Sequence, residues 1–217
     1  MEYAELAEWA VNVARRETAY QYVYRVLRHV VLDGTFSEGT HLLQTDIARS
    51  LHVSTTPVRE ALHKLASEGL VDFDAGRGAV VHTLSEDEWR ETIQIRRLLE
   101  PCALRRAADR IASQSLVEME RISAVMDVET DVVAWTDLNR QFHRIHFEAA
   151  GSPRLAGILV GLLDASAMFL ARGIAENPDI ARQTQTAHAA IIEGLRQRDG
   201  DALEETVERH LEIVLPS

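Results

Sequence analysis

Residues 51–62 read LHVSTTPVREAL, and this stretch decides how the first part of the chain folds. Ser54 has the short hydroxyl side chain that is favoured at a helix N-cap, and Pro57 is tolerated in a first turn because its missing N–H would have no partner there. The apolar residues that follow recur at helical spacing, at Val58, Ala61, Leu62 and Leu65. The pattern predicts an amphipathic helix that ends before Gly69, with hydroxyls in its first turn and Arg59 one turn further in.

Two shorter helices are predicted before this one. The first spans about 18–33 and ends at Gly34, a residue that suits a helix C-terminus. A turn covers 35–41, and a short helix then covers 43–51, with Thr45 as its candidate N-cap. The residues of this short helix expected to face inward are Ile47, Ala48 and Leu51.

Two short runs rich in β-branched residues follow the central helix. They are LVDF at 70–73 and AVVH at 79–82, and the glycine-rich sequence DAGRG at 74–78 between them is typical of a hairpin turn. Three helices followed by a two-stranded wing is the order of a winged helix-turn-helix domain, which we place at residues 18–84. Residues 1–17 are predicted to form a helical N-terminal extension.

The remaining chain, residues 85–217, has a helical pattern throughout. It opens on SEDE at 85–88, which has the spacing of a capping box with Ser85 as N-cap and Glu88 at the third helical position. We therefore expect a mainly α protein in which an N-terminal winged helix-turn-helix is followed by an all-α antiparallel helical bundle. Six helical segments are predicted in the bundle, at about 86–112, 115–128, 131–150, 153–175, 179–198 and 200–214.

The charge of the chain argues against a general binder of polyanions. The formal net charge is −11 over 217 residues. Residues 1–84 hold 8 Lys and Arg against 11 Asp and Glu, a net charge of −3, so the remaining −8 falls on residues 85–217. Any contact with nucleic acid must come from a few placed side chains, helix N-termini and dimerisation, and not from a basic field.

The cysteine content and hydropathy favour a cytoplasmic protein. Cys102 is the only cysteine, so an internal disulfide and a cysteine zinc cluster are both excluded, and a reducing cytosol fits best. No apolar run reaches the roughly 20 residues that a membrane-spanning helix needs. The N-terminus is acidic, unlike that of a signal peptide, and we expect no membrane partner.

The stretch at 51–62, followed by EGLV at 68–71, resembles the GntR family of bacterial regulators, whose corresponding string runs close to LGVSRTPVREAL…L…EGLV. The resemblance implies that the protein binds a palindromic double-stranded DNA operator as a homodimer. The implied DNA-contact positions are Thr45, Thr55, Thr56 and Arg59 with the wing residues Gly76 and Arg77. Thr55 stands where the family usually has arginine, which removes one bidentate guanine reader or phosphate clamp.

An alternative explanation of the arginine stays open at this point. On a small helical domain, Arg59 could be a solvated surface residue or an ion-pair partner of Glu60 or Glu68. Winged helices also serve protein contacts in some cases.

Residues 85–217 resemble the FCD domain of the FadR-like branch of the GntR family. The segments that carry this resemblance are RRLLEP at 96–101, LNRQFH at 138–143, AAGSP at 149–153, HAAIIEGL at 188–195 and ERH at 208–210. Six predicted helices indicate the smaller, VanR-like variant. The resemblance implies a divalent metal site at Asn139, His143, His188 and His210, and imidazole ligands suit zinc or nickel. A single histidine is usually an ordinary satisfied side chain, but three histidines with Asn139 at the spacings of the family favour a metal site. Asn139 in place of aspartate lowers the negative charge of that site.

Two residues are implied to bind an effector. In relatives, the arginine equivalent to Arg96 helps to hold a carboxylate, and a guanidinium next to a metal is a sensible receptor for a small organic acid. Alternatively, Arg96 forms a surface ion pair with Glu100, four residues later. His146 lies on the same helical face as Asn139 and His143, and we expect it to line the pocket or to be a hydrogen-bond partner, in preference to a fifth metal ligand.

Three functions are compatible with these patterns. The first is a ligand-responsive transcription regulator whose DNA affinity changes with a small carboxylate metabolite. The second is a metal-dependent enzyme that uses the histidine cluster, although no carboxylate stands at an evident catalytic spacing. The third is a direct metal sensor in which the ion itself is the signal. The motif at 51–62 favours the first.

Overall fold

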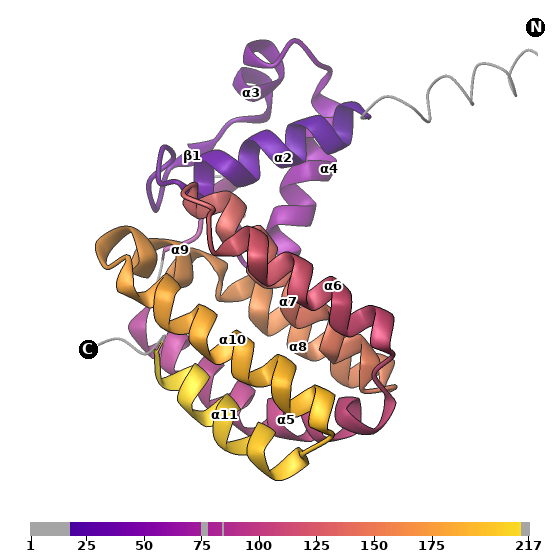
Figure 1. Cartoon of the computed structure of the whole chain (residues 1–217). Helices are drawn as coiled ribbons and strands as arrows, with labels where there is room; N and C mark the ends of the chain where they lie inside the picture. Colours follow the sequence, from indigo (N-terminus) through magenta and orange to yellow (C-terminus); the bar gives the residue numbers. More distant parts are fainter. Residues whose placement is uncertain (1–17, 75–77, 84, 214–217) are drawn as a thin grey trace, which may run out of the picture. The chain divides into compact units, whose positions relative to one another are not determined.

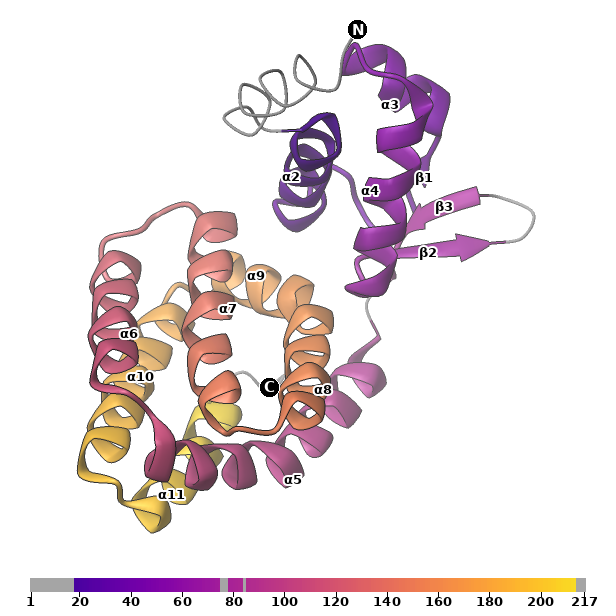
Figure 2. The ribbon, with the colours of Figure 1, turned by 90° about the vertical axis from the view of Figure 1, so that its right-hand side faces the viewer.

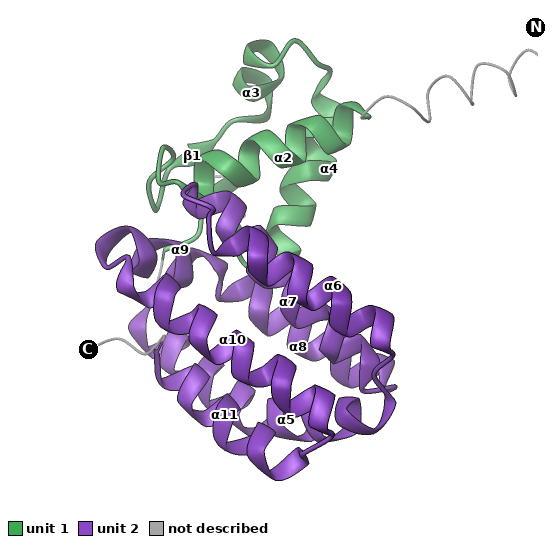
Figure 3. Cartoon of the chain, in the orientation of Figure 1, with its two compact units in different colours: residues 1–83 green, residues 84–217 purple. Residues whose placement is uncertain are grey.

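The computed structural model describes residues 18–74, 78–83 and 85–213. The chain divides into two compact units, Met1–Thr83 and Leu84–Ser217, each with its own core (Figure 3). Helices dominate both units, so the expected mainly α class is confirmed (Figure 1). The predicted extension at 1–17 lies outside the described residues.

The first unit is a winged helix-turn-helix. Its helices are α2 (Ala19–Leu32), α3 (Gln44–Ser50) and α4 (Thr55–Ser67), and its strands are β1 (His41–Leu42), β2 (Val71–Asp74) and β3 (Gly78–Val81). The strands form an antiparallel sheet in the order β1-β3-β2, in which Asp74 pairs with Gly78 at the tip of the hairpin. Figure 2 shows this hairpin projecting beside α4.

Two expectations for this unit are wrong. His41 was expected in a turn and Leu42 was assigned to no element, but the two residues form β1, because Thr40 accepts from the backbone N–H of Val81 and the sheet gains one short strand. Thr45 is not the N-cap of α3. The N-cap is Leu43, which makes no side-chain capping bond, and Thr45 is the second residue of the helix.

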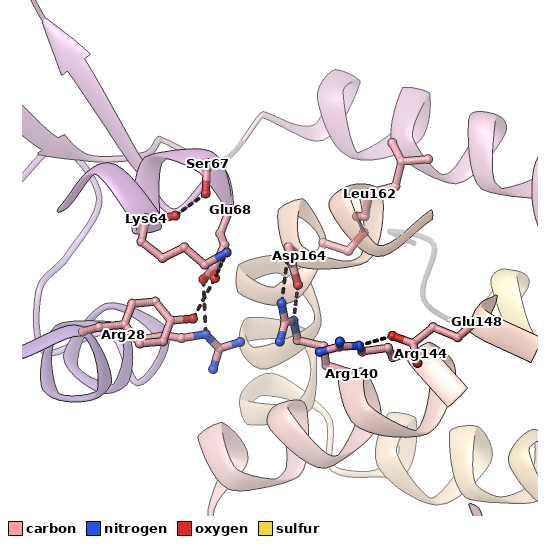
Figure 4. Close-up of polar contacts among 11 residues, drawn as sticks. Arg28, Lys64, Ser67, Glu68, Arg140, Arg144, Glu148, Leu162 and Asp164 are labelled. Atoms are coloured by element: carbon pink, nitrogen blue, oxygen red, sulfur yellow. Dashed lines mark hydrogen bonds and ion pairs between the residues drawn. The ribbon is translucent and has the colours of Figure 1, made fainter. Parts of the chain in front are cut away.

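A buried polar cluster joins α2 to the end of α4. Glu68, only 2% exposed, lies 3.5 Å from the Arg28 Nε and 3.0 Å from the Lys64 Nζ (Figure 4). It also accepts a hydrogen bond of 2.7 Å from the Tyr24 hydroxyl. A buried carboxylate needs such partners, since an unpaired charge in a low-dielectric interior is strongly unfavourable. The cluster therefore fixes the angle at which α4 leaves the core of the unit.

The second unit is an all-α bundle of seven helices over its described residues. They are α5 (Glu86–Arg110), α6 (Ser113–Met126), α7 (Val132–Ala149), α8 (Pro153–Ala165), α9 (Ala167–Glu176), α10 (Asp179–Gln197) and α11 (Gly200–Ile213). Helices α10 and α11 lie side by side, and α11 also packs against α5 (Figure 1). The main core contains Ile93, Leu104, Met119, Phe142 and Ile191, all at most 1% exposed.

The predicted count of six helices is wrong. The segment expected at 153–175 is divided at Ser166, where α8 and α9 meet at an angle of 42°. The Ser166 hydroxyl donates a hydrogen bond of 2.6 Å to the carbonyl of Leu162, a contact of a kind that often bends helices. The VanR-like assignment rested on counting this segment as one helix.

Within the described residues, one bent pair of helices has the length and composition of a possible membrane span. No single helix there is long and apolar enough to cross a membrane, and α8 with α9 passes together by length and composition only.

Candidate DNA-binding surface and candidate metal centre

Helix α4 buries one side and exposes the other, beginning in its first turn. Its apolar side is locked in the core, since Val58, Ala61, Leu62 and Leu65 are all 0% exposed. The opposite side exposes Thr55, Thr56 and Arg59. Ser54 is the N-cap, as predicted, but its side chain makes no capping hydrogen bond. The unpaired backbone N–H groups of a helix N-terminus favour anions such as phosphate, so hydroxyls and one arginine stand where a DNA backbone would be received.

Of the other expected DNA-contact residues, the structure describes Thr45 but not the two wing residues. Thr45 is exposed in the first turn of α3, the helix that packs against α4. Gly76 and Arg77 lie outside the described residues. Glu68, one of the suggested partners of Arg59, is held instead by Arg28 and Lys64.

Three histidines from separate helices converge in the core of the second unit. His143 comes from α7, His188 from α10 and His210 from α11, and their side chains are buried. The Nε2 atom of His143 lies 3.3 Å from the Nε2 of His188 and 3.2 Å from the Nε2 of His210. Ligands at the usual zinc–nitrogen distance in a tetrahedral site are separated by about 3.3 Å. The three nitrogens therefore have the spacing of a metal site.

The buried environment keeps these imidazoles neutral. Burial lowers the pKa of His143 and His188 well below the ordinary value, with smaller contributions from the neighbouring histidines. Burial also lowers the pKa of His210 to about 3, assisted by the positive charge of Arg96. A metal binds the neutral form of imidazole, so the ring nitrogens are available as ligands at neutral pH.

Asn139 is the candidate for a fourth donor, since it lines the same small cavity as His210. It lies one turn before His143 on α7, is 3% exposed, and its side-chain oxygen Oδ1 has no hydrogen-bond partner. A buried amide oxygen without a partner is unfavourable, and a cation would satisfy it. Three imidazole nitrogens and one amide oxygen make a donor set that fits zinc or nickel.

Arg96 and Glu100 form a buried ion pair, so the expectation of a surface pair is wrong. The Nε of Arg96 donates to Oε1 of Glu100 at 2.5 Å, with the two residues 3% and 0% exposed. Arg96 also lines a cavity of about 10 Å³ together with Asn139 and His210. The structure thus brings Arg96 to the same small cavity as His210, one of the three converging histidines.

His146 lies behind His143. It is fully buried, and its Nε2 is 3.1 Å from the Nδ1 of His143, on the side of that ring away from the converging nitrogens. It is not among the residues that line the cavity beside Arg96. Burial lowers its pKa to about 3, with help from His210 and Arg96.

Sequence reasoning missed two polar residues on α10. Thr184 is fully buried, lines the same cavity, and its hydroxyl has no hydrogen-bond partner. Gln185 contacts the Nδ1 of His188 at 3.2 Å. Both stand three or four residues before His188, the spacing that places side chains on one helical face, and that spacing could have identified them.

Comparison with protein families agrees with this architecture. Residues 19–81 match the bacterial regulatory proteins of the gntR family, and residues 91–213 match the FCD domain. The HTH-type transcriptional repressor RspR of Escherichia coli (strain K12) is 28% identical over 200 residues, which cover 91% of this chain and 87% of the relative. The HTH-type transcriptional repressor NanR of Cronobacter sakazakii is 25% identical over 225 residues, which cover 92% and 85% of the two chains.

Solved structures share the fold. E. coli McbR/YncC superposes with a TM-score of 0.72 at 20% identity, covering 90% of this chain and 94% of that one. A GntR family member from Pseudomonas syringae pv. tomato has a TM-score of 0.54 at 28% identity, covering 89% and 81%. The family resemblance inferred from the sequence is confirmed. The chain belongs to the gntR family of bacterial regulatory proteins, carries an FCD domain, and is a transcriptional regulator.

Proposed function

We propose that this regulator binds a palindromic DNA operator as a homodimer, and that a small carboxylate held in its helical unit changes the affinity for that operator. Residues 18–84 then form the DNA-binding domain, and residues 85–217 form the effector-binding and dimerisation domain of a cytoplasmic protein. The observation that carries the sensing part is the convergence of three buried imidazole nitrogens beside a buried guanidinium. Family membership favours a regulator over a metal-dependent enzyme.

In the proposed DNA complex, α4 lies in the major groove. Thr55 and Thr56, with the helix N-terminus, contact phosphate, and Arg59 reaches a base edge from one turn further along. Thr45 adds a phosphate contact from α3, and Arg77 adds one from the wing.

Fluorescence anisotropy with an operator selected from a random duplex pool tests the DNA contact. Loss of a bidentate base contact costs about 1–3 kcal/mol, so Arg59→Ala should weaken binding by roughly 5- to 150-fold. Arg121→Ala is the matched control, because Arg121 is exposed on α6 in the helical unit and pairs with Glu118. Unchanged affinity of the Arg59 variant would refute the assignment of α4.

In the proposed metal site, His143, His188, His210 and Asn139 hold one zinc or nickel ion. When bound, the ion supplies a Lewis-acidic position that can accept a carboxylate oxygen. The three histidines would link α7, α10 and α11 through the ion. Arg96 would donate hydrogen bonds to the same carboxylate.

The size of the cavity explains why an effector would alter the protein. A volume of about 10 Å³ corresponds to one water molecule, so an organic acid can enter only by widening it. The lining residues come from α5, α7, α8, α9, α10 and α11, and their packing must change when the cavity is filled. A ligand shifts a conformational equilibrium only if it binds one arrangement more tightly than the other. An acid that fits only the widened cavity would do so.

A thermal-shift screen tests the sensing part. Chelator-treated protein is screened against zinc, nickel and a panel of small carboxylic acids, and each stabilising compound is then added to the operator-binding assay. The proposal expects an acid that stabilises the protein and changes operator affinity in the parent but not in the double variant Arg96→Leu/Glu100→Leu, in which both charges of the pair are removed together. A metal that controls operator binding with no acid present would indicate a direct metal sensor instead.

A further inference from the structure

The orientation of the ring protons decides whether the three histidines can bind an ion. A neutral imidazole has one N–H and one nitrogen lone pair, and only the lone pair can coordinate a metal. Because the Nε2 atoms of His143, His188 and His210 converge, each ring must carry its proton on Nδ1 when an ion is held. The groups that face the Nδ1 atoms are therefore part of the site.

We propose that Gln185 and His146 are positioning residues, which set the tautomers of His188 and His143 by accepting a hydrogen bond from each Nδ1–H. This inference rests on the metal site proposed above and assigns it two residues beyond the four ligands. Partners of this kind orient the metal-binding imidazole and raise its basicity.

The orientation of Gln185 follows from its second contact. Its side-chain nitrogen Nε2 donates a hydrogen bond of 2.7 Å to the backbone carbonyl of Ser123 on α6. A carbonyl oxygen can only accept, so the amide nitrogen must face Ser123 and the amide oxygen must face His188. That oxygen lies 3.2 Å from the Nδ1 of His188, which must then carry the proton. The lone pair of His188 is left on Nε2, toward His143.

The ring of His188 is also held in place by stacking. Phe142 lies parallel to it, with ring centroids 4.0 Å apart and an interplanar angle of 15°. Gln185 and Phe142 together fix both the tautomer and the plane of this ligand.

His146 plays the corresponding part for His143. Its Nε2 lies 3.1 Å from the Nδ1 of His143, three residues earlier on α7. If His146 donated in this contact, His143 would carry its proton on Nε2, toward His188 and His210, and that proton would block coordination. With an ion bound, His143 donates from Nδ1, His146 accepts on Nε2, and the proton of His146 is on Nδ1.

The same geometry argues against His146 as a further ligand. Its Nε2 is occupied by the contact with His143, and its Nδ1 is buried without a hydrogen-bond partner. The group of ligand atoms that lie within 4.8 Å of one another contains His143, His188 and His210. His146 therefore acts through His143.

Zinc affinity of the full-length protein, measured by competition with a chromogenic chelator, tests the proposal. Loss of a partner of this kind typically lowers metal affinity by about 10- to 100-fold. We expect this loss for His146→Leu, which cannot accept a hydrogen bond, and a smaller loss for His146→Gln, whose amide oxygen can. Gln185→Met should behave like His146→Leu, and Gln183→Met, at an exposed position on α10, should leave affinity unchanged.

Two further readouts separate positioning from a structural role. The metal-free His146→Leu protein should melt close to the parent temperature, because removal of the unpartnered Nδ1 of His146 offsets the loss of its contact with the Nδ1 of His143. Long-range ¹H–¹⁵N spectra of the zinc-loaded parent should show His143 and His188 protonated on Nδ1.

The outcomes distinguish this inference from the function on which it rests. A parent protein that binds no zinc would overturn the metal site and this inference with it. A parent that binds zinc, with equal affinity in His146→Leu and Gln185→Met, would overturn this inference alone.

Discussion

Acid should destabilise the metal-free protein steeply, because four neutral histidines are buried in one unit. The exposed fractions of His143, His146 and His188 are 0%, and that of His210 is 3%. Burial lowers the pKa of each from the ordinary value of a histidine, 6.5, to about 3 for His146 and His210 and well below that value for the other two. The unfolded chain, in which these rings are solvated, then binds protons more readily than the folded chain. The contribution to stability is fully present above pH 6.5 and is lost progressively as the pH falls below it.

The size of the loss follows from proton linkage. Between pH 7 and pH 5.5, a histidine that stays neutral in the folded protein and titrates normally in the unfolded chain removes about 1 kcal/mol of unfolding free energy. Four such rings give an upper limit of about 4–5 kcal/mol, compared with a total stability of about 5–15 kcal/mol for a typical domain. Zinc should oppose the loss, because an ion that binds only the folded state stabilises it.

Urea unfolding followed by tryptophan fluorescence measures this effect. Trp89 and Trp135 are buried in the helical unit, at 4% and 3% exposure, so the signal reports on the relevant core. With a denaturant slope of about 2 kcal/mol/M, the midpoint should fall by about 2 M between pH 7 and pH 5.5.

Two variants provide the controls for the pH experiment. His146→Leu should reduce the pH dependence by about a quarter, since it removes one of the four titrating rings. His41→Gln, at an exposed position in the other unit, should not change it. A midpoint that stays constant across this pH range would show that the four rings are solvated in the folded protein, and the reasoning would be refuted.

Three further predictions concern other parts of the chain. Glu68→Ala should destabilise the winged unit by about 3 kcal/mol, because it removes the buried carboxylate that pairs with Arg28 and Lys64, whereas exposed Glu60→Ala should change stability by less than about 0.5 kcal/mol, both measured by urea unfolding followed by far-UV circular dichroism. Thr55→Arg, which restores the usual family residue, should tighten operator binding and steepen its log–log salt dependence by about one unit; an unchanged slope would mean that this position does not reach phosphate. Asn139→Asp should bind zinc more tightly in the chelator competition, and a carboxylate effector should change its operator affinity less; a larger change in operator affinity than in the parent would contradict the prediction.

Local rules predicted the elements that have strong local patterns. The apolar spacing behind Ser54 predicted α4 to within one residue of its observed start, and the glycine-rich sequence after Asp72 predicted the hairpin of β2 and β3. Both patterns are fixed by neighbours in the chain. The histidine cluster was predicted only through the family resemblance, since ligands 45 and 67 residues apart from His143 have no common local pattern.

The failures come from contacts that a local pattern does not contain. Strand β1 is two residues long and exists because Leu42 pairs with Ala79 across the sheet. The break at Ser166 has no proline or glycine to mark it, and the hydroxyl contact of Ser166 with the preceding turn also occurs at Thr136 inside the unbroken helix α7, so no local pattern identifies the break. The spacing of Arg96 and Glu100 predicted their ion pair correctly but not its burial, which is set by the helices packed around α5.

Asn139, which stands in place of aspartate, affects the kind of ligand that the site can hold. The buried groups around the cavity are neutral histidines, a neutral amide and the ion pair of Arg96 with Glu100, so their charges sum to zero. A divalent ion bound there adds two positive charges with no carboxylate among the four proposed ligands to offset them. In a low-dielectric interior this excess is costly, and an anion that enters beside the ion and Arg96 relieves it. Aspartate at position 139 would supply part of that negative charge from the protein itself. With asparagine at this position, the negative charge must come from the ligand. The site should therefore bind its ion less tightly in the absence of a carboxylate and gain more ion affinity when a carboxylate is bound.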